Sequence, residues 1–217
     1  MKNVFCLIFF VGIIIGCESG SGVAEFESIK NELPKIGKFM HTGADIDSVA
    51  NWLGRPTKDG RELLEPINLI IVDLLSSSEE ESRQKLIDIL KDAGFPQRPG
   101  HSSGYKGLIN EQFFEQTPSV DNVAFADFMW AFTNSHARFF GPFKSKSMYT
   151  WIGSSSQEKG TIHDYVSFNY SRDLMTKNIS ERTNAEYLGN VNLENRIDSK
   201  SQSTGDHDGF AKLIKIK

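Results

Sequence analysis

Six side chains in the second half of the chain have the chemistry of a general acid–base site. They are His136, Arg138, His163, Asp164, Arg172 and Asp173. His136 and Arg138 are two residues apart, so on a strand they share a face. A histidine, a carboxylate and an arginine that converge could transfer protons to and from an anionic substrate. The alternative is a structural ion-pair network that holds the strands in place.

Other reactive patterns are weaker. His136, His163 and residues 206–208 (Asp-His-Asp) could supply metal ligands, but the chain has no His-Glu-x-x-His motif and no calcium loop of known spacing. Residues 206–208 are more simply a turn. Residues 153–156 lack the Gly-x-Ser-x-Gly pattern of a hydrolase nucleophile, and residues 100–104 form a flexible loop without a phosphate-loop ending. We therefore expect no metal site and no cofactor.

Composition limits the classes of protein that remain. The chain has 217 residues, 39% of them hydrophobic, and 24 basic against 28 acidic side chains give a net charge of -4. This indicates one soluble domain, and without a basic cluster there is no electrostatic basis for nucleic-acid binding. The two cysteines are Cys6 and Cys17. A disulfide framework, a zinc finger and a thiol enzyme are excluded for the rest of the chain.

The N-terminus has the features of an export signal. Lys2 precedes an apolar run over residues 4–15, which is shorter than the roughly 20 residues that a spanning helix needs. Residues 14–17 (Ile-Ile-Gly-Cys) resemble the lipobox of bacterial lipoproteins. That resemblance implies a signal peptide over residues 1–16 and a diacylated Cys17, with chains such as palmitate holding the protein at a membrane. A plain secretory signal with an unmodified cysteine is the alternative.

The lipobox resemblance also implies a location and a layout for the mature protein. We expect a flexible tether over residues 17–26, which are rich in glycine and serine. One domain follows over residues 27–217, in the bacterial cell envelope on its periplasmic or surface side.

Hydrophobic patterning predicts an α+β domain, with a mixed sheet and helices packed on it. Residues 67–72 are almost entirely aliphatic, which is typical of a strand buried on both faces. Residues 78–93 predict an amphipathic helix, because Ser78 and Glu81 form a capping box and apolar residues recur every three or four positions.

Further strands are predicted over residues 136–140, 147–152, 165–170 and 210–216. A turn at Gly141-Pro142 is expected to join the first two. Residues 120–132 fit a strand and a helix equally well.

Several short motifs occur in a recognisable order. They lie at residues 66–70, 93–95, 136–140, 151–153, 162–164, 172–173 and 208–209. This order resembles the LssY C-terminal-like domain, a family of bacterial envelope proteins, over residues 27–217. The chain departs from the family at Phe95, where the family has tryptophan, and at Phe210, where it has arginine. The resemblance implies an envelope domain, in many members attached to membrane segments, and transfers no specific chemistry.

Two functions are consistent with these features. We favour an envelope lipoprotein whose domain binds or scaffolds an envelope protein partner, in assembly or secretion. The alternative is an envelope enzyme of hydrolase type that uses the His/Arg/Asp residues. An enzyme needs those side chains to converge at a concave pocket that solvent reaches. An exposed aromatic patch would favour the binding module.

Overall fold

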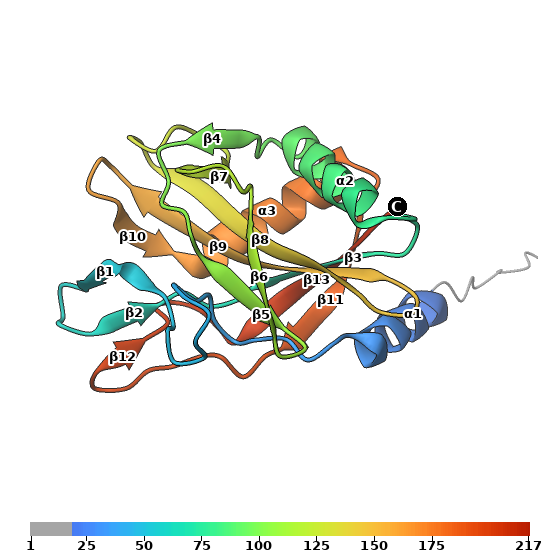
Figure 1. Ribbon diagram of the computed structural model, residues 1–217, viewed down its shortest axis with the longest axis horizontal. Helices are drawn as coiled ribbons and strands as arrows, with labels where there is room; N and C mark the ends of the chain where they lie inside the picture. Colours follow the sequence, from blue (N-terminus) through green and yellow to red (C-terminus); the bar gives the residue numbers. More distant parts are fainter. Residues whose placement is uncertain (1–18) are drawn as a thin grey trace, which may run out of the picture.

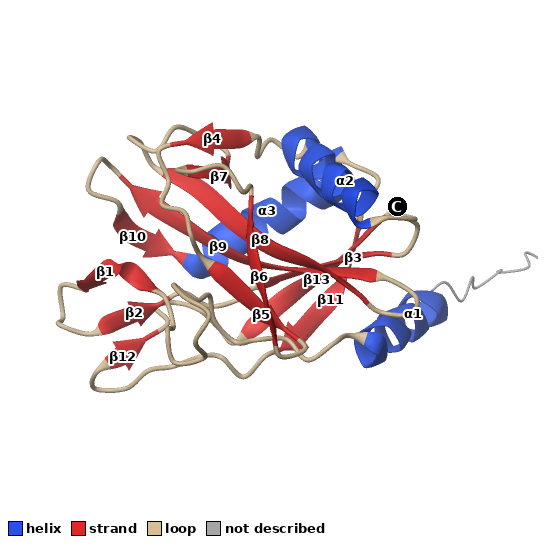
Figure 2. Cartoon of the chain, in the orientation of Figure 1, coloured by secondary structure: helices blue, strands red, loops and turns tan. Residues whose placement is uncertain are grey.

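A mixed β-sheet with helices on both faces forms the centre of the molecule (Figure 1 and Figure 2). The computed structural model describes residues 19–217. Helices α2 (Glu79–Asp92) and α3 (Phe168–Arg182) cover one face of the sheet. Helix α1 (Ser19–Glu32) packs against the other face. The predicted α+β class is confirmed.

The central sheet contains ten strands. Seven of them form a continuous path in the order β11 (Glu186–Asn192), β13 (Phe210–Ile216), β3 (Leu69–Asp73), β9 (Tyr149–Lys159), β8 (Asn134–Lys144), β6 (Gln112–Thr117) and β5 (Lys106–Ile109). Off this path, β10 (Asp164–Ser167) pairs with β9, and β7 (Val123–Ala126) pairs with β8 and with β4 (Gln97–Pro99). Among the described strands of this sheet, β13 and β3 pair in parallel and the other pairs are antiparallel. The terminal strand is confirmed, and part of the ambiguous segment 120–132 is a strand.

A small three-stranded sheet lies at the end of the molecule opposite α1 (Figure 1). It consists of β1 (Asn51–Pro56), β2 (Glu62–Leu64) and β12 (Gln202–Ser203). The indole N–H of Trp52 in β1 donates a 2.7 Å hydrogen bond to the carbonyl of His163. The small sheet therefore holds the turn that follows β9.

Strand β3 is buried on both faces, as its aliphatic run predicts. Leu69 and Ile71 pack under α2 and α3, and Ile70 and Val72 pack in the cluster beneath α1. The side chains alternate between the two layers because successive residues of a strand point to opposite faces.

The predicted helix over residues 78–93 is α2. Its N-cap is Ser78, whose hydroxyl accepts a hydrogen bond from the Glu81 backbone N–H. The Glu81 carboxylate accepts from the backbone N–H of Ser77, one residue earlier than a capping box has it. Leu86, Leu90 and the C-cap Ala93 are buried as the spacing indicates.

The predicted strand over residues 165–170 is wrong beyond Ser167, where α3 begins. The buried face of α3 includes Ser171, Arg172 and Thr176 among its apolar residues. These polar side chains interrupt the hydrophobic periodicity that reveals a helix. The backbone N–H of Phe168 is capped by Asp206, which lies far away in the sequence.

The predicted turn at Gly141-Pro142 is also wrong. Both residues lie inside β8, at an irregularity in the β8–β9 register between Phe140 and Phe143. The chain reverses after Lys144, where the Ser145 N–H donates to the Met148 carbonyl. Glycine and proline also mark strand irregularities, so their presence does not by itself define a turn.

The predicted tether over residues 17–26 is wrong from Ser19 onward, because that part lies in α1. Phe26 packs over Gly189 of β11, and Glu25 forms an ion pair with Lys215 of β13. The signal at residues 1–16 and Cys17 lie outside the described residues. Within residues 19–217, no helix is long and apolar enough to cross a membrane.

Candidate active site

The neighbouring strands β8 and β9 present polar side chains on the same face of the sheet. His136 and Arg138 lie on β8, opposite Ser156 and Ser154 of β9. Glu158 of β9 is opposite Asn134. Ala137 and Phe139, between them on β8, point into the core under α2 and α3. The expectation that His136 and Arg138 share a face is confirmed.

His136, Arg138 and Glu158 line a cavity of about 310 Å³. The loop after β4 adds His101, and the turn between β9 and β10 adds His163. The complete lining is Trp52, Leu53, Glu65, Gly100, His101, Ser102, Asn122, His136, Arg138, Glu158 and His163. His163 is the histidine that solvent reaches, with 22% of its side chain exposed.

Glu158 lies at the centre of the histidines. Its Oε2 is 2.9 Å from Nδ1 of His163, and its Oε1 is 3.6 Å from Nδ1 of His101 and 3.9 Å from Nδ1 of His136. The side-chain amide of Asn134 donates a 3.2 Å hydrogen bond to Oε1. The carboxylate is buried. One acidic side chain thus contacts or closely approaches three imidazoles.

Burial sets the protonation of the inner histidines. It lowers the pKa of His101 to about 3 and the pKa of His136 well below its usual value, and the positive charge of Arg138 acts in the same direction. Both rings are therefore neutral at physiological pH. Burial also raises the pKa of Glu65 to about 7; Arg138 opposes this shift and Glu158 adds to it.

Two ring nitrogens of this cluster have no partner. Within residues 19–217, Nδ1 of His136 and Nε2 of His101 are buried without a hydrogen bond. Nε2 of His136 is 3.3 Å from the hydroxyl of Ser156. One ligand atom each from His101, His136 and Glu158 lies within 4.8 Å of the other two, so these three residues could hold a metal ion.

His163 is held in an uncommon conformation. Its φ of +54° is rare for a residue other than glycine and is seen most often in turns and functional sites. Trp52 binds its carbonyl, and Trp130 stacks on its ring at 5.7 Å between centroids. Trp130 in turn packs against Gly100, where a Cβ atom would lie 2.0 Å from the indole.

Arg138 faces the cavity but is bound to the neighbouring loop. Its guanidinium donates to the carbonyl and the hydroxyl of Ser102, both at 3.0 Å, and lies over the ring of Tyr105. It is buried. Arg138 therefore fixes the loop that carries His101, and its charge is not free for a substrate.

Asp164 does not join this cluster, so that part of the predicted site is wrong. It lines a neighbouring cavity of about 530 Å³ with Trp52, Arg55 and Tyr165. His163 lies in the turn before β10, with its positive φ, and Asp164 is the first residue of β10.

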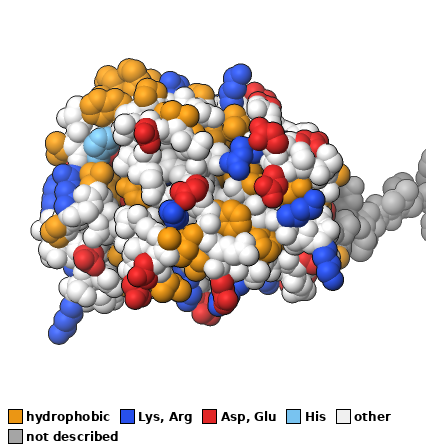
Figure 3. Space-filling view, in the orientation of Figure 1, with side chains coloured by type: hydrophobic (Ala, Val, Ile, Leu, Met, Phe, Trp, Pro, Cys, Tyr) orange, Lys and Arg blue, Asp and Glu red, His pale blue; other side chains and the backbone are white. Residues whose placement is uncertain are grey.

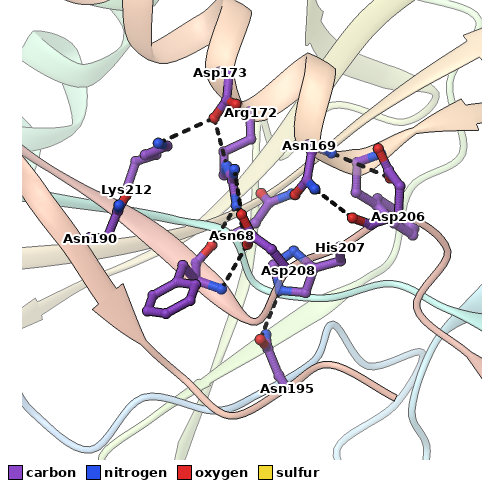
Figure 4. Close-up of polar contacts among 12 residues, drawn as sticks. Asn68, Asn169, Arg172, Asp173, Asn190, Asn195, Asp206, His207, Asp208 and Lys212 are labelled. Atoms are coloured by element: carbon purple, nitrogen blue, oxygen red, sulfur yellow. Dashed lines mark hydrogen bonds and ion pairs between the residues drawn. The ribbon is translucent and has the colours of Figure 1, made fainter. Parts of the chain in front are cut away.

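Arg172 and Asp173 are also not part of the pocket (Figure 4). Arg172 is buried and binds both carboxylate oxygens of Asp208, at 2.6 and 3.0 Å. It also donates to Asp173 and to the carbonyl of Phe210, and Asp173 contacts Lys212. For these two residues the ion-pair alternative is correct, because the network ties α3 to the start of β13.

Three residues of the pocket were missed by sequence reasoning. The sequence predicts a flexible loop around His101, and Glu65 and Glu158 belong to none of the candidate groups. Correct pairing of β8 with β9 would have identified Glu158, since it lies two residues beyond Ser156, the partner of His136. The misplaced turn at residues 141–142 concealed that register. Nothing in the local sequence marks Glu65.

Fold and site together define a single-domain α+β protein with a polar, histidine-rich pocket at one end of its sheet. No protein-family model, no curated protein and no solved structure matches the chain. The resemblance to the LssY C-terminal-like domain stays a prediction.

Proposed function

We propose that the protein is an envelope enzyme of hydrolase type whose reaction takes place beside His163 and Glu158. One observation supports this most strongly. His163 is 2.9 Å from a buried carboxylate, in a cavity that it shares with His101 and His136. A base positioned by an acidic residue, facing a cavity that can hold substrate, is the arrangement that general base catalysis requires.

The proton positions follow from the chemistry of the pair. A carboxylate only accepts hydrogen bonds, so a neutral His163 carries its proton on Nδ1, which faces Glu158. Nε2 is then free to take a proton from a water molecule or a hydroxyl group in the cavity. Stacking of Trp130 on the ring restricts its rotation. The pair would activate water for attack on an ester, phosphoester or glycosidic bond.

The unpartnered nitrogens argue against a purely structural network. Burial of a polar atom without a hydrogen bond costs about 1–3 kcal/mol. His101 buries such a nitrogen at Nε2 and His136 at Nδ1. By contrast, every nitrogen of the Arg172 guanidinium has a partner. A cluster that only stabilised the fold would have no reason to retain the unpaired atoms.

The envelope location rests on the N-terminal sequence. We propose that Cys17 is lipidated and anchors the domain to a membrane, as in bacterial lipoproteins. Helix α1 begins two residues after Cys17, at the end of the molecule opposite the small sheet and the pocket (Figure 1). The pocket would then face away from the anchoring membrane. A role of an LssY-like domain in envelope assembly or secretion is compatible with this orientation.

Hydrolysis is tested with the full chain, produced as the mature lipoprotein in detergent. The substrates are activated esters, phosphoesters and glycosides. We expect turnover of one class, and a reduction of about 10²–10⁴-fold in His163→Ala. His41→Ala is the matched control, because His41 is buried outside the pocket against Phe113. No turnover of any class, or equal turnover by His163→Ala, would contradict the proposal.

An exposed apolar patch supports a second function, that of a binding module. The loop after β7 exposes Phe128, Met129, Trp130 and Phe132, and each side chain is at least about a third accessible. Figure 3 shows hydrophobic side chains gathered at the upper left of the molecule. Contiguous exposed apolar side chains often mark a contact surface. Cross-linking in the native cells should capture a partner that Phe128→Ser/Phe132→Ser does not bind; identical capture by both would exclude this role.

A further inference from the structure

We propose that His101, His136 and Glu158 form a binding site for a divalent transition-metal ion of the zinc class. The site lies in the same pocket as the proposed hydrolase and rests on that function for its use. Metal binding itself can be measured without turnover. Two imidazoles and one carboxylate are a common ligand set of catalytic zinc sites.

The distances between these three residues suit a shared ion better than direct hydrogen bonds. Nδ1 of His101 and Nδ1 of His136 lie 3.6 and 3.9 Å from Oε1 of Glu158. Hydrogen bonds between nitrogen and oxygen are about 2.7–3.2 Å long. Two ligands bound tetrahedrally to zinc at about 2.0–2.1 Å lie about 3.3 Å apart. Small side-chain movements would therefore bring all three into range of one ion.

The unpartnered nitrogens give the second, independent observation. His136 is 2% exposed, and its Nδ1, which is 3.9 Å from Oε1 of Glu158, has no partner among residues 19–217. His101 is 3% exposed, and its unpartnered nitrogen is Nε2. When Nε2 of His136 donates to Ser156, the lone pair of Nδ1 points at the cluster. A metal ion would satisfy this lone pair, which no protein group does.

The surroundings resemble an outer ligand shell. Asn134 donates to Oε1 of Glu158, and His163 contacts Oε2, so the carboxylate is oriented from two sides. Ser156 supports the ring of His136. Such contacts fix the direction of metal ligands and strengthen binding. The positive charge of Arg138 opposes a cation, but Arg138 also faces the buried carboxyl of Glu65.

The ligand number indicates a catalytic rather than a structural site. Three protein ligands leave a tetrahedral ion with one open position, and structural zinc sites fill all four with protein. The cavity of about 310 Å³ adjoins the three residues and leaves room for a water molecule at that position. His163 lies on the same carboxylate and is within reach of such a water.

The test is a zinc titration of the full chain, purified without a histidine tag and stripped with a chelator. Calorimetry should give one zinc ion per chain, and zinc should raise the melting temperature. We expect His136→Ala and His101→Gln each to weaken zinc binding by at least about tenfold. His41→Ala should bind zinc like the wild type. His101 lies in a loop, so His101→Gln keeps the test valid if His136→Ala does not fold.

The outcomes separate the two proposals. The metal site would be overturned if the wild type bound no zinc. It would also be overturned if folded His101→Gln and His136→Ala bound zinc as tightly as the wild type. Zinc bound by these residues with no turnover of any substrate class would overturn the hydrolase alone. Turnover that persists after complete removal of the metal would support the hydrolase and show that its reaction does not require the ion.

Discussion

Glu158 organises the pocket because one buried carboxylate serves several neighbours at once. It contacts His163, accepts a hydrogen bond from Asn134, and lies near two further imidazoles. Glu158 lies on β9, and these contacts come from β8, a loop and a turn. The chemistry that we propose depends on their combined geometry, and replacement of Glu158 should affect every function of the pocket.

A histidine outside the pocket should control part of the acid stability. His207 is buried and its Nε2 is 2.8 Å from the side-chain oxygen of Asn195, shown in Figure 4. Burial lowers the pKa of His207 to about 4; Asp208 opposes this shift and Arg172 adds to it. Below pH 6.5 the unfolded chain takes up a proton that the folded chain does not. The contribution of His207 to the free energy of unfolding is therefore fully present above pH 6.5 and is lost as the pH drops toward 4.

Urea unfolding at pH 7.5 and pH 4.5 measures this effect. For one histidine with this shift, the loss amounts to up to about 3 kcal/mol. The amide of His207→Gln can still donate to Asn195. In this variant the free energy of unfolding should fall less between pH 7.5 and pH 4.5 than in the wild type, by part of that amount. An equal loss in the wild type and in His207→Gln would show that His207 does not titrate in this way.

At the scale of elements, α3 is joined to β13 by an ion-pair network around the buried guanidinium of Arg172. Asp208→Ala would leave the guanidinium of Arg172 buried with Asp173 as its remaining carboxylate partner. We expect a loss of about 3 kcal/mol in the free energy of unfolding. Asp198→Ala, in an exposed pair with Arg61, should cost less than about 1 kcal/mol. Chemical denaturation checks both, and equal losses would contradict the structural role.

Elements with strong local signals could be predicted from the sequence. The continuous aliphatic run of β3 and the capped, periodic α2 are examples. Helix α3 could not be predicted, because Arg172 and other polar residues lie on its buried face and Asp206 caps it from a distance. The pocket was found in part: His136, Arg138 and His163 belong to it. Other members, among them Glu65, His101 and Glu158, come from segments far apart in the sequence that the fold brings together.

At the scale of the whole molecule, α1 lies at the end opposite the small sheet (Figure 1), whose strand β1 contributes Trp52 and Leu53 to the pocket. An anchor just before α1 would hold the domain with its pocket toward the surrounding compartment. Substrates would then arrive from solution and not from the anchoring membrane. With an anchor at Cys17, the packing of α1 on β11 would restrict how far the domain can move from the membrane.

Removal of the anchor should change location without changing chemistry. We expect Cys17→Ser to move the protein from the membrane fraction to the soluble fraction, since the lipid chains would no longer be attached. Its turnover of a soluble substrate should equal that of the wild type, because the described residues that line the pocket lie between Trp52 and His163. Cell fractionation and a rate assay measure the two effects. A Cys17→Ser protein that stays membrane-bound with unchanged gel mobility would contradict lipidation.

That the pocket around Glu158 performs hydrolysis is tested most directly by one comparison of rates. Turnover of the best substrate is measured for the wild type and for Glu158→Gln, at equal folded fraction confirmed by circular dichroism. Glu194→Gln, an exposed substitution of the same kind, is the control. We predict a reduction of at least about a hundredfold in Glu158→Gln and none in the control. Equal rates in all three proteins would contradict the central claim.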